Sequence, residues 1–389
     1  MTTYSTESEV VDAAVAMLQQ LLPASWTVTT NPAESFALPS GAAPIPSRPG
    51  RFDGVLQIQS QSGGFGQLVI EARTSFAPRD VAEMLRGINS VYRRQGPGGL
   101  IVIAPQLSAR SRDLLSAAGV HYIDLTGQIR IRIDSPPLFL ERDVATDTNR
   151  VTSPATSTQL RGPRAGRIVR VLIDAAPPYR VKDVAMAAEV SLGYVSKALE
   201  ALDAEALVQR GRRGEVLDCD WAALLRRWAT ASSMMTGERA LQFIAPAGIE
   251  QAADALGALT SRWVISGSFG ATSLAAVTAP SLLVVYTDDP DEFATSASLL
   301  ATTKAADILV VQPTDPVVYA RRWRNDRYFV AAPSQLAADC LNGPGRMPAE
   351  GEELIRWMTE NEPTWRAANL AALSANDLGP DLPARPLFR

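Results

Sequence analysis

Residues 164–218 read RAGRIVRVLIDAAPPYRVKDVAMAAEVSLGYVSKALEALDAEALVQRGRRGEVLD, and this stretch decides the fold of the middle of the chain. Apolar residues recur at helical spacing in 164–175, 181–188 and 193–205, and a tight turn at 190–193 joins the last two segments. A strand, a basic turn and a second strand follow. Three helices followed by a β-hairpin are typical of the winged helix-turn-helix, so we expect such a DNA-binding domain over residues 161–230.

A winged helix binds double-stranded DNA with its third helix and its hairpin. The first turn of the third helix offers N–H groups to a phosphate, and polar side chains outside its apolar stripe are placed to face the major groove. Arginines at the hairpin tip and at the start of the first helix are placed to contact the DNA backbone or the minor groove. The residues expected to contact DNA are Ser191, Tyr194, Ser196, Lys197, Arg210, Arg212, Arg213, Arg164 and Arg167. A winged helix that contacts protein instead is the alternative.

Charge and length support this division of the chain. The 389 residues suffice for two to three domains. Residues 161–230 hold 12 basic and 9 acidic side chains, whereas residues 1–160 hold 13 and 14 and residues 231–389 hold 12 and 18. A positive block between two acidic blocks indicates a nucleic-acid-binding module between other domains. We therefore expect an α/β domain at 1–143, a Ser/Thr-rich linker at 144–160, the winged helix at 161–230, an α/β domain at 238–373 and a tail at 374–389.

Two carboxylates stand out in the first domain, where strand and helix patterns alternate as α, β, β, α, β, α, β. Asp53 and Glu71 fall on neighbouring strands and can meet at one edge of the sheet. This arrangement resembles the restriction-endonuclease-like core, in which an Asp and a Glu-x-Lys bind Mg²⁺ and orient a water for attack on a phosphodiester. A further carboxylate can come from the first helix, which offers Glu7, Glu9 and Asp12.

Arg73 stands where that resemblance places a lysine. Arginine stays protonated and cannot act as a base, although it can stabilise negative charge. We therefore favour a degenerate nuclease fold that is kept for binding or dimerisation. The alternative is a Mg²⁺-dependent DNA nuclease that uses Asp53, Glu71 and Arg73 and is targeted by the winged helix.

The third block contains a strand, a Gly/Ser turn and a helix in RWVISGSFGATSL, residues 262–274, and a second strand that ends in Asp288 and Asp289. These features are similar to a nucleotidyltransferase site, where carboxylates hold Mg²⁺ and the turn holds a triphosphate. Adjacent residues of a strand point to opposite sides, so these two carboxylates are poorly placed for one metal. We expect a nucleotidyltransferase-like mixed α/β domain that is degenerate.

Further along this block, an apolar strand runs into Pro-Ser-Gln-Leu and is followed by a helix, a glycine turn and an acidic helix. This order resembles the C-terminal domain of AbiEi-type transcriptional regulators, the antitoxins of type IV toxin–antitoxin systems. Residues 119–131, GVHYIDLTGQIRI, resemble a segment in the N-terminal domain of the larger members. The C-terminal resemblance is carried by Pro333, Gln335, Leu336, Asp339, Gly345, Arg346 and Glu350.

The resemblance implies a repressor that regulates its own operon and a C-terminal domain that faces a toxin. Compact antitoxins of this family open with the winged helix, whereas this chain places an α/β domain before it. A regulator without a toxin partner therefore stays open, and so does a homodimer.

Composition argues against several other classes. One histidine, His121, and two cysteines argue against a His-triad hydrolase, a His/Cys zinc site and a disulfide framework. No apolar run reaches 18 residues and no signal-peptide pattern is present, so we expect a cytoplasmic protein without membrane contact. We expect no cofactor, with Mg²⁺ required only by the nuclease alternative.

Overall fold

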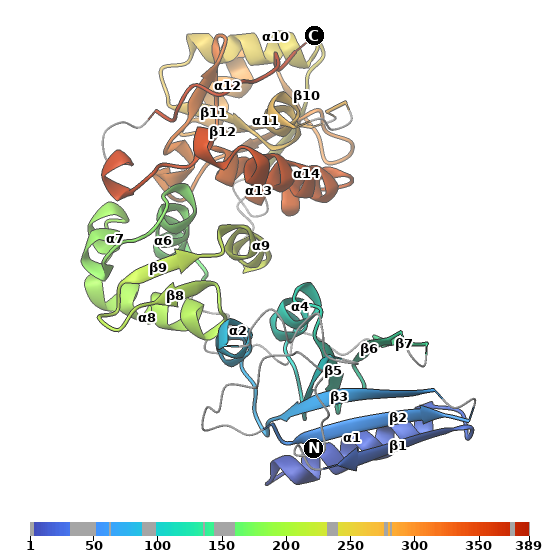
Figure 1. Ribbon diagram of the computed structural model, residues 1–389. Coiled ribbons are helices and arrows are strands. Elements are labelled where there is room, and N and C mark those ends of the chain that lie inside the picture. Colours follow the sequence, from blue (N-terminus) through green and yellow to red (C-terminus); the bar gives the residue numbers. More distant parts are fainter. Residues whose placement is uncertain are drawn as a thin grey trace. The chain divides into compact units, whose positions relative to one another are not determined.

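The computed structural model describes residues 4–31, 52–61, 64–87, 99–134, 137–143, 160–231, 240–275, 279–280, 282–373 and 378–388. The chain divides into two compact units, residues 1–153 and 154–389, with residues 204–206 assigned to the first (Figure 1). Helices and mixed sheets in the two units confirm the expected α/β multidomain class. The predicted linker lies outside the described residues except for Leu160.

The first unit is built on a seven-stranded sheet whose strand order follows the chain, β1 to β7. Pairing is antiparallel from β1 to β3, parallel from β3 to β5 and antiparallel again from β5 to β7. Helix α1 covers one face, and α2 and α4 cover the other (Figure 1). The bounds are α1 Glu7–Leu21, β1 Trp26–Asn31, β2 Gly54–Ser60, β3 Phe65–Ala72, α2 Pro78–Gly87, β4 Leu100–Ala104, α4 Ala109–Ala117, β5 His121–Asp124, β6 Ile129–Ile133 and β7 Leu138–Arg142.

Local sequence explains the elements of this unit. Helix α1 begins at a capping box between Thr6 and Glu9, and α4 begins at Ser108, whose side chain accepts the Ser111 N–H. The sequence pattern did not predict β1 and β7. These two strands lie at the edges of the sheet and bury few side chains, so their apolar alternation is weak.

The second unit opens with residues 160–231, which we call the winged-helix module after the fold that the sequence predicts there. Three helices, a two-stranded hairpin and a fourth helix follow one another. The first three helices and the two strands come in the order that the sequence predicts. Val195, Leu199 and Leu202 of α8 are buried, as their helical spacing predicts. The bounds are α6 Pro163–Asp174, α7 Val181–Ala187, α8 Leu192–Ala204, β8 Val208–Arg210, β9 Val216–Cys219 and α9 Trp221–Ala231.

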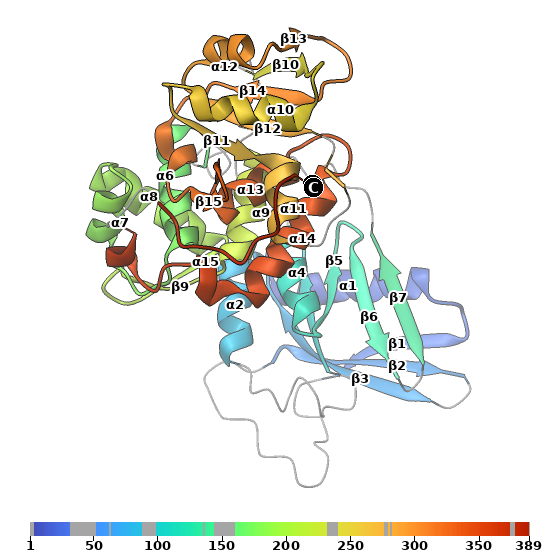
Figure 2. The same ribbon diagram turned by 90° about the horizontal axis from the view of Figure 1, so that it is seen from above.

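The C-terminal domain, residues 240–388, is a seven-stranded mixed sheet in the order β13-β10-β14-β12-β11-β16-β15. Helices α10 and α12 lie on one face, and α11, α13 and α14 pack together on the other (Figure 2). Its strands are β10 Ala240–Ile244, β11 Trp263–Ser266, β12 Leu283–Thr287, β13 Leu300–Ala301, β14 Ile308–Val311, β15 Trp323–Asn325 and β16 Tyr328–Val330. Its helices are α10 Ile249–Asp254, η3 Ala255–Ala258, α11 Gly267–Leu274, α12 Pro290–Ser296, η4 Pro316–Tyr319, α13 Pro333–Leu341, α14 Met347–Glu360, α15 Glu362–Trp365 and η5 Leu370–Ala372.

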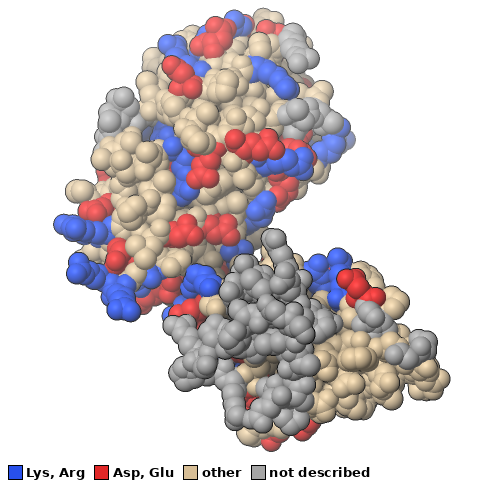
Figure 3. Space-filling view, in the orientation of Figure 1, with Lys and Arg blue, Asp and Glu red and all other residues tan. Residues whose placement is uncertain are grey.

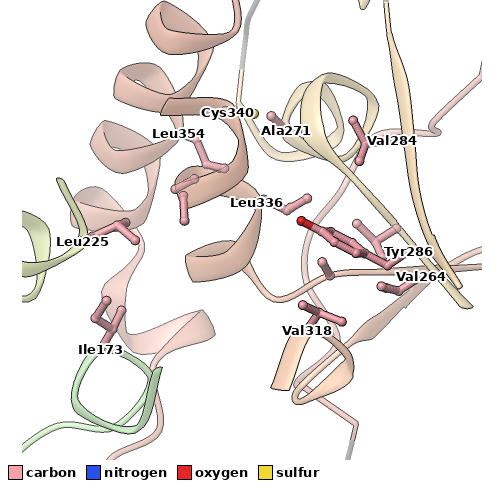
Figure 4. Packing of buried hydrophobic residues seen from close by; sticks show 14 of the residues in the cluster. Ile173, Leu225, Val264, Ala271, Val284, Tyr286, Val318, Leu336, Cys340 and Leu354 are labelled. Atoms are coloured by element: carbon pink, nitrogen blue, oxygen red, sulfur yellow. The ribbon is translucent and has the colours of Figure 1, made fainter. Parts of the chain in front are cut away.

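The winged-helix module and the C-terminal domain share one hydrophobic core, which differs from the separate domains that the sequence suggested. Ile173 of α6 and Leu225 of α9 belong to the same buried cluster as Leu336 of α13 and Leu354 of α14 (Figure 4). Helix α9 supplies much of this contact, and its apolar side faces α13. The predicted boundary near residues 230–237 falls largely outside the described residues.

The predicted tail also packs onto this core. Its described part, residues 378–388, contains no helix or extended strand, as expected, yet Phe388 lies against Phe269 and Tyr328 with ring centroids 5.2 and 5.3 Å apart. Leu387 is buried in the same cluster. The tail therefore contributes to the stability of the C-terminal domain.

A buried arginine joins the two parts of this unit. Arg170 of α6 is only 2% exposed, and its guanidinium pairs with Asp174 one helical turn away at 3.0 Å. Its Nη1 donates to the Gln335 side chain at 3.0 Å and to the Val317 carbonyl at 3.1 Å, and its Nη2 donates to the Ala320 carbonyl at 3.0 Å. The last three acceptors belong to the C-terminal domain. One winged-helix side chain therefore holds η4 and α13 together with α6.

The contact continues into the C-terminal domain through Gln335. Its Nε2 donates to the Asp339 carboxylate at 3.0 Å, and the same carboxylate accepts the Tyr286 and Ser266 hydroxyls. Burial raises the pKa of Asp339 to about 6, although these hydrogen bonds and Arg170 oppose the rise. Two residues that carry the AbiEi resemblance, Gln335 and Asp339, thus form a buried polar network with the winged-helix module.

We predict that Arg170→Ala lowers the unfolding free energy of the second unit by about 3–5 kcal/mol, because it leaves the buried Asp174 carboxylate without its cation and the Gln335 side-chain oxygen without its donor. Arg226→Ala is the matched control, since Arg226 also joins the module to the C-terminal domain, through Glu352 on α14. Both partners of that pair are nearly half exposed, so a loss of about 1 kcal/mol or less is expected. Chemical denaturation measures both, and equal losses would contradict the role assigned to Arg170.

Candidate nucleic-acid interface

Helix α8 presents a polar face opposite its buried stripe. Ser191 and Lys197 are exposed, and Tyr194 and Ser196 are half-buried. The Ser196 hydroxyl lies 3.4 Å from the carboxylate of Glu200, the exposed residue one turn further along. The expected base-reading positions of α8 therefore lie at its surface, within the first two turns.

Sequence reasoning missed an apolar residue at the start of this helix. Leu192 is 56% exposed, next to the polar positions of α8. It continues the helical spacing of Val195, Leu199 and Leu202, so the sequence pattern predicts burial and contains no signal for its exposure. An apolar side chain at such a position suits the methyl group of a thymine.

The hairpin tip is a short turn fixed by backbone hydrogen bonds. The Gly211 N–H donates to the Glu215 carbonyl at 2.8 Å, and the Gly214 N–H donates to the Gly211 carbonyl at 3.0 Å. The Arg213 N–H donates to the Glu215 carboxylate at 2.9 Å. The side chains of Arg212 and Arg213 are exposed at the tip, so the turn presents two guanidinium groups to solvent.

Arg210 lies at the base of that turn. It is half-buried, and its Nε donates to the Gly214 carbonyl at 3.3 Å. Gly214 adopts a positive φ of 82°, a conformation that favours glycine, and this residue returns the chain into β9. The tip is thus a defined structure and not an open loop.

The two predicted arginines of the first helix differ. Arg164 is exposed in the first turn of α6. Arg167 instead packs in the contact with the C-terminal domain, where its Nε donates to both carboxylate oxygens of Asp315 at 2.9 and 3.2 Å. Asp315 is only 3% exposed. Since this pair fastens α6 to η4, Arg167 has a structural partner that the sequence did not show.

Basic side chains gather at the edge of the second unit that carries α7, α8 and the hairpin (Figure 3). The exposed members there include Arg180, Lys182, Lys197, Arg212 and Arg213. Acidic residues lie among them, so the edge is mixed in sign with a basic excess. A surface of this kind attracts a polyanion moderately, and the strength of that attraction falls as the salt concentration rises.

In the first unit, the predicted carboxylates do come together around Arg73. The Arg73 guanidinium contacts Glu71, pairs with Glu7 of α1 at 3.1 Å and lies 3.8 Å from Asp53. Asp53 also accepts the Ala72 N–H at 2.7 Å. Burial raises the pKa of both Asp53 and Glu71, and repulsion from Glu7 adds to the rise in each; for Glu71, repulsion from Asp53 adds to it as well.

This set does not fit a Mg²⁺ site. The Arg73 guanidinium lies among the three carboxylates and already supplies the positive charge that a cation would bring. In the part of the chain that the structure describes, no group of three or more His, Cys, Asp or Glu side chains is arranged to hold a metal ion. Glu9 contributes instead to the cap of α1. The geometry therefore indicates a charge-neutralising cluster.

The remaining acidic pair, Asp288 and Asp289, is divided between two structural roles. Asp288 pairs with Arg262 at 2.8 Å and accepts the Tyr319 hydroxyl at 2.9 Å. The Asp289 side chain accepts the Glu292 N–H and caps α12. The two carboxylates thus serve different partners, although both residues follow the end of β12 at Thr287 and neither lies on the strand that the prediction assumed.

The 119–131 stretch forms β5, a turn and β6. Asp124 is buried and accepts the N–H groups of Leu107 and Thr126, so it holds the loop after β4 against the turn. The Nδ1 atom of His121 accepts the Arg132 N–H at 3.2 Å. Both residues have structural roles in this geometry.

Comparisons with family models, curated proteins and solved structures gave no match to this chain. None of the helices in the described part of the chain has both the length and the apolar character that crossing a bilayer requires. Both cysteines, Cys219 and Cys340, are buried and carry no disulfide.

We predict that Arg73→Gln destabilises the first unit more at alkaline than at acidic pH. The raised pKa values of Asp53 and Glu71 mean that their contribution to stability is present at low pH and is lost as pH rises through those values. Without Arg73 this loss of stability grows. We expect the variant's free energy of unfolding to lie about 1–2 kcal/mol below that of the wild type near pH 8 and to be nearly equal to it near pH 4, given partial solvent screening. Calorimetry at the two pH values measures it, with Arg132→Gln as the control from an exposed pair in the same unit. A deficit of the same size at both pH values would contradict this prediction.

Proposed function

We propose that this protein is a transcriptional regulator that binds double-stranded DNA sequence-specifically through its winged-helix module. The observation that carries the proposal is the placement of two sets of side chains on one module. Polar residues lie on the exposed face of α8, and Arg212 and Arg213 project from the fixed tip of the adjoining hairpin. A helix for the groove and a basic wing for the backbone are what this class of DNA reader uses.

The roles divide by chemistry. Tyr194, Ser196 and Lys197 would read base edges in the major groove, since they lie in the first two turns of α8. Ser191, Arg164 and the wing arginines would contact phosphate and fix the register. Arg167 is left out of this surface because its guanidinium is bound to Asp315.

We infer from the resemblance to AbiEi-type regulators that the protein represses its own operon. In that proposal the acidic C-terminal domain is the surface for a cognate toxin, where one exists. The first unit would serve binding or homodimerisation, since Arg73 neutralises the carboxylates of its candidate nuclease site.

The wing is tested by charge removal. We predict that Arg212→Ala combined with Arg213→Ala weakens binding to every duplex and reduces the salt slope, log K against log salt concentration, by up to about two. The control is Arg324→Ala with Arg356→Ala, which removes the same charge from exposed positions of the C-terminal domain. Fluorescence anisotropy over a salt series measures both slopes. An unchanged slope in the wing variant would remove the wing from the interface.

Specificity is tested at α8. Lys197→Ala should weaken binding to the preferred site by about 1–3 kcal/mol and binding to random duplex much less, because a base contact counts only on the right sequence. Lys182→Ala, which removes an exposed lysine from α7, is the matched control. Equal losses on both duplexes would assign Lys197 to phosphate contact instead.

The nuclease alternative has a direct test of its own. Plasmid cleavage that requires Mg²⁺ or Mn²⁺ and is lost in Asp53→Ala would favour it over the role proposed for the first unit.

A further inference from the structure

A cavity of about 510 Å³ lies between the winged-helix module and the C-terminal domain. Its walls come from α6, from the end of α7 and from η4 with the residues that follow it. The two parts share one core, so these walls belong to one compact unit. The volume is in the range of sites that hold small organic molecules.

Arginines outnumber carboxylates among the described residues that line this cavity. Two of these arginines contact Asp174. Arg170 pairs with its side-chain carboxylate at 3.0 Å, and Arg321 donates to its backbone carbonyl at 2.5 Å. The other Nη of Arg321 donates to the Trp365 carbonyl. Burial lowers the pKa of Arg321 and the nearby Arg170 adds to this effect, whereas Asp174 opposes it. The charged lining consists of Arg167, Arg170, Arg262, Arg321, Asp174, Asp315 and Glu189.

One wall of the cavity also offers a flat surface. The Arg262 guanidinium lies over the Tyr319 ring, 4.8 Å from its centroid, and both residues line the cavity. An aromatic ring beside a guanidinium fork suits an organic molecule that carries a charged group and an apolar or planar part.

We propose that this cavity binds a small organic anion bearing carboxylate or phosphate groups. The anion contacts Arg262 and the Tyr319 ring at the wall and lies beside Arg167, whose side chain is 30% exposed. The cavity differs from the DNA surface, since the wing arginines and the polar face of α8 do not line it.

Occupancy would also reach the DNA-reading helix, a step that rests on the proposed DNA-binding function. Glu189 lies in the turn between α7 and α8, and its carboxylate is 3.7 Å from Arg167. An anion that enters beside Arg167 repels Glu189 and competes with it for the guanidinium. The α7–α8 turn then shifts, and the affinity for DNA changes with it.

Binding is measured first without DNA, by isothermal titration of the full chain with citrate and with pyrophosphate at ionic strength matched by sodium chloride. The two anions distinguish carboxylate from phosphate chemistry. We expect saturable binding of at least one of them at a single site. Two variants should weaken it about tenfold or more: Arg262→Gln, which removes a lining charge that is largely exposed, and Ala187→Trp, which fills the cavity from the end of α7.

Arg356→Gln is the control, since it removes an exposed charge from α14 and should leave anion binding unchanged. No saturable binding of either anion, or equal binding by wild type and both cavity variants, would overturn the site. DNA affinity is then measured with and without the anion that binds. If the protein binds the anion but no DNA, the proposed DNA-binding function is refuted and the anion site is not. If the protein binds both and its affinity for DNA is the same with and without the anion, the coupling is refuted.

Discussion

The buried guanidinium of Arg170 is the contact on which the second unit depends. It is almost fully removed from water and is compensated by Asp174 in its own helix and by three oxygens of the C-terminal domain. A charge in such a place is tolerated only when its partners are present in the right geometry. The winged helix is therefore not a module on a flexible tether, because separating it from the C-terminal domain exposes both the apolar core and a network of unpaired polar groups.

This architecture bears directly on how the protein would work. The α8 surface and the wing face solvent, while α6 and α9 are committed to the C-terminal domain. We propose that the packed helices and the Arg170 network couple ligand binding at the C-terminal domain to α8. In the first unit the candidate catalytic carboxylates surround the guanidinium of Arg73, and this arrangement supports the binding role that we propose for that unit over the nuclease alternative.

The sequence predicts those features that depend on local periodicity. The stripe of Val195, Leu199 and Leu202 is sufficient to place the buried and exposed faces of α8. The convergence of Asp53 and Glu71 follows from their positions on paired strands, which are joined by Gly54 opposite Ile70. The stripe is read within one helix, and the convergence is read from two strand patterns that are neighbours in the chain.

Long-range partners are what the sequence does not reveal. Arg167 looked like a phosphate contact, but its partner Asp315 lies 148 residues away in the chain. Gln335 is 165 residues from Arg170, and no pattern near either residue indicates that they meet. For the same reason the single core shared by two apparent domains, and the cavity between them, emerged only from the structure.

The central claim is sequence-specific DNA binding, and it is tested most directly by comparing two duplexes of equal length and base composition. One is the DNA immediately upstream of this protein's own coding sequence, and the other is its scrambled counterpart, each titrated over a salt series without divalent metal. The account predicts that the protein's affinity for both duplexes falls as the salt concentration rises. It also predicts that, at each salt concentration, the protein binds the upstream duplex at least about a thousandfold more tightly than the scrambled one. Equal affinity for the two duplexes throughout the series would contradict it.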